Sequence, residues 1–236
     1  RFVSVTNGDA GHHEMGGIQL ARRRRAEAEA AGVVAGIEYH VMDNHDGELE
    51  PSLENRKKII RMIRSYTPDL ILTHRPNDYH PDHRYTSILV QDSAYMVCVP
   101  NICTNMTPLK TNPVIAYLSD GFQKPTPFAP DVVIDIDDVV EKKLDMLHCH
   151  TSQMYEWLPW IGGNIDEVPE GNAERRKWLE HRLGRFVGVA DDYRDKLIEL
   201  YGEEHGSEVT YAEGFEGCEY GDKLTDTRIR SLFPIE

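Results

Sequence analysis

Short apolar segments that alternate with helix-length segments are the feature that most constrains the fold of this chain. Five segments have the β-branched and aliphatic residues typical of strands: Phe2–Thr6, Ile37–Met42, Leu70–Thr73, Val114–Leu118 and Val132–Ile136. Leu70–Thr73 is a continuous apolar run of the kind that buried parallel strands have. Strands that alternate with helices in this way predict an α/β fold in three α/β/α layers, with a mostly parallel sheet.

The segments between these strands carry helix signals. Helices are expected at Ile18–Ala31, Leu53–Tyr66, His80–Cys98, Val139–Gln153 and Ala173–Tyr201. Pro81 suits a first helical turn, where its missing N–H is not needed. Residues 157–172 are rich in Gly, Pro and Trp and predict an irregular segment. Because no linker separates these elements, we expect a single domain over residues 1–236, with a core at 1–153 and a C-terminal elaboration at 154–236.

Charge and composition exclude several classes of protein. The 236 residues include 40 acidic and 26 basic side chains, a formal net charge of −14, which argues against a nucleic-acid partner. The sequence has no apolar run of the roughly 20 residues that a membrane span needs. Its four cysteines form no Cys-x-x-Cys pair, which favours a reducing, cytoplasmic compartment.

Polar clusters follow three of the predicted strands. They are Asn7–His13, Asp43–Asp46 and His74–His83. Ligands of open parallel sheets bind at the carboxyl ends of the strands, so the three clusters are expected to converge on one site. The alternative is that all three are ordinary solvated turns.

The segment His80-Pro81-Asp82-His83 is the most informative of these clusters. Two histidines three residues apart in a first helical turn share one face and can approach the same ion or substrate. Asp82 can hydrogen-bond an imidazole nitrogen and so fix its tautomer. A zinc site needs about three protein ligands, and this cluster supplies one or two. Two ordinary surface imidazoles at the start of an acidic helix are the alternative.

Four motifs, which follow one another along the chain in the family's order, resemble those of the PIG-L (LmbE-like) family of zinc-dependent de-N-acetylases. Residues 68–83, from Pro-Asp-Leu-Ile-Leu-Thr through Asn-Asp to His-Pro-Asp-His, look like the family's second motif. Arg24–Glu27 is similar to its Arg-x-x-Glu, Asp46–Leu49 to its Asp-Gly-x-Leu, and His150–Gln153 to its His-x-Ser-Gln. The resemblance implies a Rossmann-like fold and a hydrolase that removes an N-acetyl group from an amino sugar such as N-acetylglucosamine, or from a sugar conjugate.

The same resemblance implies roles for individual residues. His83 would be a ligand of Zn²⁺, and His80 would stabilise the oxyanion or protonate the leaving amine. Asp82 would orient the ring of His80. Three further residues would bind substrate: Arg24, Asp46 and His150. Family members often assemble into trimers or hexamers, so a homo-oligomer is expected.

The sequence departs from the family at its start. The family's first motif, His-Pro-Asp-Asp, supplies two zinc ligands and a general base, and it does not occur before Phe2. We therefore expect a first strand to be missing between Phe2–Thr6 and Leu70–Thr73. On this interpretation the chain by itself binds zinc poorly and is inactive, whereas the intact parent is the enzyme.

Other interpretations stay open for several features. A non-catalytic sugar- or nucleotide-binding module on the same fold is the second hypothesis, and a dinucleotide-binding protein ranks last because no Gly-x-Gly-x-x-Gly follows a strand. The run Arg22–Arg25 is typical of a solvated helix face, and His12 and His13 are expected to form a flexible rim. Trp157 and Trp160 could stack on a sugar face, or pack in a lid or a subunit contact. Asp78 and Tyr79 are left without a role.

Overall fold

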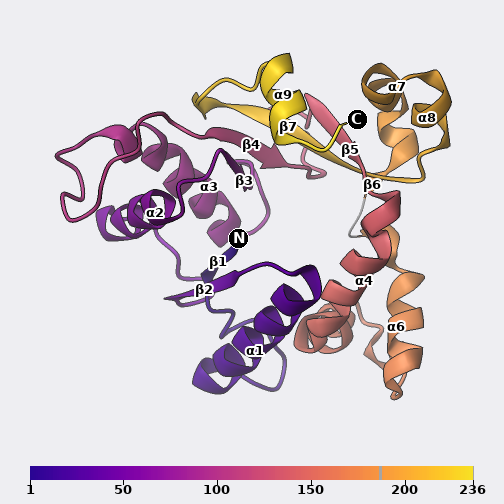
Figure 1. Cartoon of the computed structure of the whole chain (residues 1–236). Coiled ribbons are helices and arrows are strands. Elements are labelled where there is room, and N and C mark those ends of the chain that lie inside the picture. Colours follow the sequence, from indigo (N-terminus) through magenta and orange to yellow (C-terminus); the bar gives the residue numbers. More distant parts are fainter. Residues whose placement is uncertain (186–187, 236) are drawn as a thin grey trace. The chain divides into compact units, whose positions relative to one another are not determined.

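The computed structural model describes residues 1–185 and 188–235, and the chain divides into two compact units (Figure 1). The first unit consists of Arg1–Leu49 and Ile136–Val189, and the second consists of Glu50–Asp135 and Ala190–Glu236. Each unit combines parallel strands with helices, so the predicted α/β class is confirmed. The single-domain assignment stays a prediction.

The first unit is built around one parallel strand pair. Strand β1 (Phe2–Thr6) pairs with β2 (Tyr39–Asn44), with Phe2 opposite Tyr39 and Thr6 opposite Asn44. Helix α1 (Gly17–Ala35) connects them and packs on β2 and on α4 (Val140–Cys149). Gly36 ends α1 in the left-handed region at φ 72°, which a glycine adopts without steric cost.

The remaining elements of the first unit are short. After α4 come a π-helical turn at Gln153–Trp157 and the helices α5 (Leu158–Ile161) and α6 (Asn172–Glu180), and β6 (Gly188–Val189) lies near the end of the unit. The predicted long helix from Ala173 to Tyr201 is therefore wrong, because α6 ends at Glu180. Two glycines, Gly184 and Gly188, follow within eight residues, and glycine is among the poorest helix formers.

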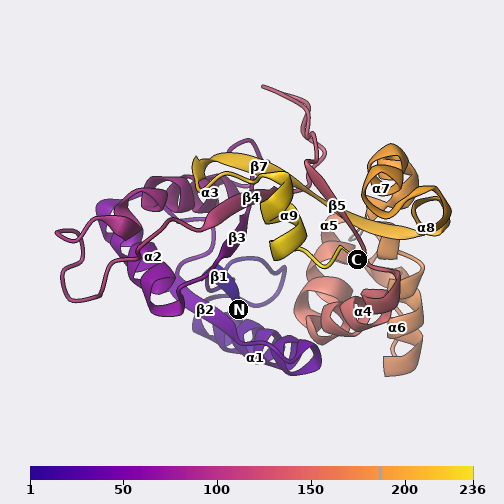
Figure 2. The ribbon, with the colours of Figure 1, turned by 45° about the horizontal axis from the view of Figure 1, so that its top comes forward.

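The second unit has a mixed sheet with the order β3-β4-β7-β5 (Figure 2). Strands β3 (Leu70–Thr73) and β4 (Val114–Leu118) are parallel, whereas β7 (Tyr211–Gly221) is antiparallel to both β4 and β5 (Val132–Asp135). The sequence predicts a mostly parallel sheet, and its pattern does not predict β7. Three glycines and three glutamates obscure its strand pattern.

Helices cover the second unit. Helix α2 (Leu53–Tyr66) packs on α3 (Pro81–Ala94), and its N-cap Ser52 accepts a hydrogen bond from the Asn55 backbone. Helix α7 (Arg194–Tyr201) packs on β5, followed by α8 (Glu203–Glu208) and, after β7, α9 (Asp226–Leu232). A buried apolar cluster lies under α7 and contains Val133, Ala190, Leu197, Val209 and Ala212. Among the described helices, none combines the length and the apolar character that crossing a bilayer requires.

Two of these strands have a single neighbour among the described residues. Strand β1 pairs with β2 alone, and β3 pairs with β4 alone. These are the two strands that the sequence analysis expected to flank a further strand. That further strand stays a prediction.

Candidate active site

The loop from His74 to His80 connects the carboxyl end of β3 to α3. His80 is the N-cap of the helix, with extended backbone angles (φ −93°, ψ 131°), and Pro81 occupies the first helical position. Proline there needs no hydrogen-bond partner, and its fixed φ favours the first turn. The sequence therefore places His80 and His83 three residues apart at one helix start, as the spacing predicted.

The ring of His80 is oriented by the backbone of its own helix. Its Nδ1 accepts a hydrogen bond from the Asp82 backbone N–H at 3.2 Å, as an N-cap side chain does. In the neutral imidazole the proton is then assigned to Nε2. The carboxylate of Asp82 is buried, with its Oδ2 3.9 Å from His80 Nδ1. His80 thus presents an N–H donor at Nε2.

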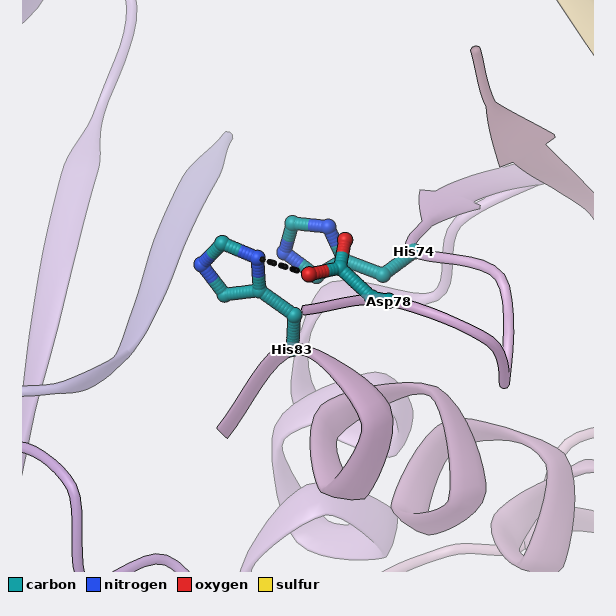
Figure 3. Close-up of side chains that lie close together, drawn as sticks. All are labelled: His74, Asp78 and His83. Atoms are coloured by element: carbon teal, nitrogen blue, oxygen red, sulfur yellow. Dashed lines mark hydrogen bonds and ion pairs between the residues drawn. The ribbon is translucent and has the colours of Figure 1, made fainter. Parts of the chain in front are cut away.

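His83 has the opposite tautomer. Its Nδ1 lies 3.0 Å from Asp78 Oδ1, and a carboxylate can only accept, so Nδ1 carries the proton (Figure 3). The same Asp78 oxygen accepts the backbone N–H of His80 at 2.9 Å. Nε2 of His83 points away from Asp78 and retains its lone pair (Figure 3). A carboxylate on the second nitrogen of an imidazole is the usual support of a metal-ligating histidine.

His74 fixes the plane of the His83 ring. The two imidazoles are stacked with centroids 4.3 Å apart and planes 3° from parallel. Burial, and secondarily the neighbouring His83, lower the pKa of His74 to about 4. His74 is therefore neutral at pH 7 and stacks on His83 without charge repulsion.

His74, Asp78 and His83 have potential ligand atoms within 4.8 Å of one another. The two stacked rings lie in separate, parallel planes, however, so their in-plane lone pairs do not meet at one ion. Asp78 Oδ1 is also occupied by two hydrogen bonds. This cluster can therefore offer zinc one ligand, the free Nε2 of His83, with His74 and Asp78 as supports of that ring, out of the about three that a zinc site needs.

In the first unit, two of the predicted substrate-binding residues meet around a glycine. Arg24 donates from Nη2 to the carbonyl oxygen of Gly11 at 2.5 Å. A Cβ at Gly11 would lie 3.2 Å from Asp46 Oδ2 and 3.5 Å from Arg24 Nη2. Because Gly11 has no side chain, Arg24 and Asp46 can both approach the chain there. Burial lowers the pKa of Arg24 below its ordinary value.

Asp9, which the sequence analysis did not single out, holds the two strand-end loops of this unit together. Its Oδ1 accepts the Asp46 backbone N–H at 3.0 Å, and its Oδ2 lies 2.6 Å from His45 Nδ1. Its position directly after β1, in a polar cluster, was the signal that could have identified it.

The Arg-x-x-Glu and His-x-Ser-Gln motifs bind each other. Glu27 is buried and accepts hydrogen bonds from the Thr151 hydroxyl (2.8 Å), the Ser152 N–H (2.9 Å) and the Ser152 hydroxyl (2.6 Å). These bonds join α1 to the start of the π-helical segment. His150 ends α4 and packs edge-on against Tyr39, with ring centroids 6.0 Å apart. Burial lowers the pKa of His150.

Two other expectations for this unit are wrong. The Arg22–Arg25 run is not simply a solvated face. Arg23 donates to both Glu156 oxygens at 2.5 and 2.7 Å, and Arg24 donates to the Gly11 carbonyl oxygen. His12 does not form a flexible rim, since its side chain is 4% exposed and its Nε2 lies 2.7 Å from Glu156. The tryptophans stack on neighbouring rings: Trp160, which is 48% exposed, lies 5.5 Å from Trp157 and 5.3 Å from His13 between ring centroids. Neither of the two alternatives for them is tested by these contacts.

The fold and this histidine-bearing loop define the chain as an α/β protein with a candidate metal and acid–base centre at a strand's carboxyl end. Residues 1–94 match the family PIG-L, GlcNAc-PI de-N-acetylase, which confirms the resemblance seen in the motifs. The chain is 30% identical over 176 residues to diacetylchitobiose deacetylase of Thermococcus kodakarensis, which covers 68% of this chain and 63% of that protein.

Two further relatives extend the comparison. The structure of N,N'-diacetylchitobiose deacetylase from Pyrococcus horikoshii has 25% sequence identity and a TM-score of 0.66, over 92% of this chain and 71% of that one. A 4-oxalmesaconate hydratase of Pseudomonas putida is 23% identical over 61% of this chain and 56% of its own length. The chain thus spans less than two thirds of the length of these two curated relatives.

Proposed function

We propose that this chain belongs to a zinc-dependent hydrolase that removes an N-acetyl group from an amino sugar or sugar conjugate. The observation that carries the proposal is the opposite tautomers of two imidazoles at one helix start. His83 offers a lone pair at Nε2, and His80 offers an N–H at Nε2. Amide hydrolysis on a metal needs both a ligand for the ion and a donor for the developing oxyanion.

His83 would hold the zinc ion through Nε2, supported by Asp78 and by the stacked ring of His74. Bound zinc would act as a Lewis acid that polarises the acyl carbonyl and lowers the pKa of a water molecule towards about 7. Because the pKa of His74 lies near 4, the stack adds no positive charge beside the ion at neutral pH.

His80 would donate from Nε2 to the oxyanion, or pass that proton to the leaving amine. Asp82 acts on His80 in two ways: its backbone N–H fixes Nδ1 as an acceptor, and its buried carboxylate lies 3.9 Å from that nitrogen. A positive charge that forms on the ring is therefore stabilised.

Arg24, Asp46 and His150 would bind the substrate. Arg24 Nε is buried and has no hydrogen-bond partner among the described residues, and a sugar oxygen that enters beside it would accept this N–H. Asp46 lies beside the same glycine and can accept from a sugar hydroxyl. His150 is the weakest of the three assignments on geometry, since its ring packs on Tyr39.

Two other functions compete with deacetylation. A non-catalytic sugar- or nucleotide-binding module would keep the fold without the ion. The hydratase relative suggests addition of water to a carbon–carbon double bond, but its identity to this chain, 23%, is lower than the 30% of the deacetylase. Deacetylation is therefore the favoured reaction.

The remaining properties are proposed on narrower grounds. One imidazole is a weak zinc site, so we expect this 236-residue chain by itself to bind zinc weakly and to lack activity. The four cysteines are free thiols, in keeping with a reducing, cytoplasmic compartment. Assembly into trimers or hexamers, and the absence of a nucleic-acid partner, stay predictions from the sequence.

A zinc titration combined with an acetate-release assay tests the proposed function. In the protein at its natural full length, we expect near-stoichiometric zinc and release of acetate from N-acetylated chitobiose. His83→Ala should abolish both. His205→Ala, which removes an exposed histidine paired with Asp135 in the same unit, is the matched control and should change neither. Zinc binding that survives His83→Ala, or hydration of an unsaturated acid without acetate release, would overturn the proposal.

A further inference from the structure

The loop that carries His74 and Asp78 has no regular secondary structure of its own. It begins after the last residue of β3, Thr73, and ends where α3 starts at Pro81. The position of the two supporting side chains therefore depends on contacts that the loop makes with other segments.

Arg75, the residue after His74, makes the most extensive of these contacts. Its side chain is only 4% exposed. Nη2 donates to the Thr126 carbonyl oxygen at 2.6 Å, and Nη1 donates to Asp120 Oδ1 at 3.2 Å. Nε lies 3.5 Å from Glu216 Oε2, on strand β7. One guanidinium therefore joins the histidine loop to the segment after β4 and to the sheet.

A second, weaker link lies two residues further along the loop. Asn77 donates from Nδ2 to the Lys124 carbonyl oxygen at 2.9 Å. The guanidinium of Arg75 also lies 5.9 Å from the ring of Phe128. Arg75 and Asn77 thus fasten residues 120–128 to the loop on both sides of Pro76.

We propose that Arg75 is a positioning residue for the candidate active site: by anchoring the His74–His80 loop to residues 120–128, it determines which nitrogen of His83 is free. The proposal rests on the proposed function for its chemical meaning. It acts through Asp78, because only a carboxylate held in place keeps the proton of His83 on Nδ1.

The role requires arginine in particular. The planar guanidinium reaches three separate acceptors at fixed angles, whereas a lysine ammonium is a single point with one nitrogen. Arg75→Lys keeps the charge next to Asp120 and Glu216 but cannot keep all three contacts. The loop should then lose its anchor while the unit keeps its net charge.

The test is a nitrogen-15 NMR measurement of imidazole tautomers in the metal-free protein. In the wild type, His83 should be protonated on Nδ1 and His80 on Nε2 at pH 7.5. Arg75→Lys should shift His83 towards the mixture of tautomers found in an unstructured peptide. In protein that binds zinc, Arg75→Lys should lower the zinc affinity about 10-fold, as the loss of a group that supports a metal-ligating histidine does.

Arg64→Lys is the matched control. Arg64 has the same 4% exposure and lies in the same unit, but its donors go to backbone carbonyl oxygens between Met96 and Met106. It should lose comparable stability without changing the tautomer of His83. An equal tautomer change in both variants would show that Arg75 is merely structural.

Asn77→Ala keeps the proposal testable if Arg75→Lys does not fold. It removes only the Lys124 link and should move the His83 signals in the same direction by a smaller amount. Unchanged His83 signals in a folded Arg75→Lys or Asn77→Ala protein would overturn the proposal. The NMR measurement uses no metal and no substrate. Its result therefore does not depend on whether the protein is a deacetylase.

Discussion

The two units hold their candidate functional side chains in different ways. In the first unit, charged groups hold each other: Arg23 binds Glu27 and Glu156, and Glu27 binds the Ser152 segment. In the second unit, the ring of His83 is held by the neutral ring of His74 and by one carboxylate, Asp78, and the ion pairs of Arg75 anchor the loop behind them. Buried ion pairs are costly to break singly, whereas a neutral imidazole pair is sensitive to orientation. The ionic network of the first unit stabilises its fold, whereas Asp78 in the second unit determines which nitrogen of His83 carries the proton.

The largest expected effect is on turnover and comes from the second unit. His80→Asn keeps an N-cap side chain for α3 but removes the Nε2–H donor. We expect turnover to fall about 10² to 10⁴-fold with zinc content unchanged, because a positioned acid contributes that much. Measuring kcat together with bound zinc checks both parts. A variant with wild-type turnover would remove His80 from the chemistry.

Breaking the ionic network should give the largest loss of stability. Glu27→Ala leaves the Thr151 and Ser152 donors without their buried acceptor and should cost about 3 kcal/mol, although Arg23 keeps Glu156. The three tryptophans, Trp157, Trp160 and Trp178, all belong to the first unit, so their fluorescence reports its unfolding in urea.

Glu29→Ala, on the exposed side of the same helix, is the control for Glu27→Ala and should leave the fluorescence midpoint unchanged. Equal midpoints for the two variants would contradict a network in which Glu27 is central. Zinc affinity per folded molecule should be the same in both, because neither change touches the histidine loop.

A smaller effect, on zinc affinity, is expected from Asp78, the residue that supports the proposed zinc ligand His83. Asp78→Ala removes the acceptor of His83 Nδ1–H and should weaken zinc binding about 10-fold to 100-fold, or about 1.4 to 2.7 kcal/mol. Competition with a chelator measures the change. Asp69→Ala, at an exposed carboxylate before β3, serves as the comparison and should bind zinc like the wild type.

The smallest effect is a pH dependence of the first unit. Burial alone would raise the pKa of Glu156, but hydrogen bonds from Arg23 and His12 outweigh it and hold the pKa below its ordinary value. A carboxyl with a lowered pKa stabilises the fold above its unfolded value near 4.5, and this contribution is lost as the pH falls through the folded pKa.

Urea midpoints followed by tryptophan fluorescence between pH 7 and pH 3 measure this contribution. The wild type should lose more stability than Glu156→Gln over that range. Parallel pH profiles for the two proteins would show that the Arg23–Glu156–His12 contacts do not depend on the charge of Glu156.

Local sequence patterns predicted most elements but few partners. Strands β1, β3 and β4 and helix α2 have the predicted bounds, because each has a clear apolar period between turn residues. Strand β7 was missed because its pairing with β4 and β5 comes from distant residues and its own pattern is broken by glycine. Such tertiary contacts are not visible in a local window.

The same distinction applies to the candidate site. The spacing in His80-Pro81-Asp82-His83 was enough to place two imidazoles on one helix start. Asp78 and Arg75 could not be given roles, because their partners are fixed only by the folded loop. Glu27 was read as part of a motif, yet only the structure identified Ser152 and Thr151 as its partners.

Strand β7 has a consequence for how this molecule is made. It fills the position between β4 and β5, although 92 residues separate Leu118 from Tyr211. During synthesis on the ribosome, β4 and β5 therefore each have an unpaired edge until β7 emerges. Contacts of such sequence separation form slowly, so the nascent second unit is the part that would depend on a chaperone.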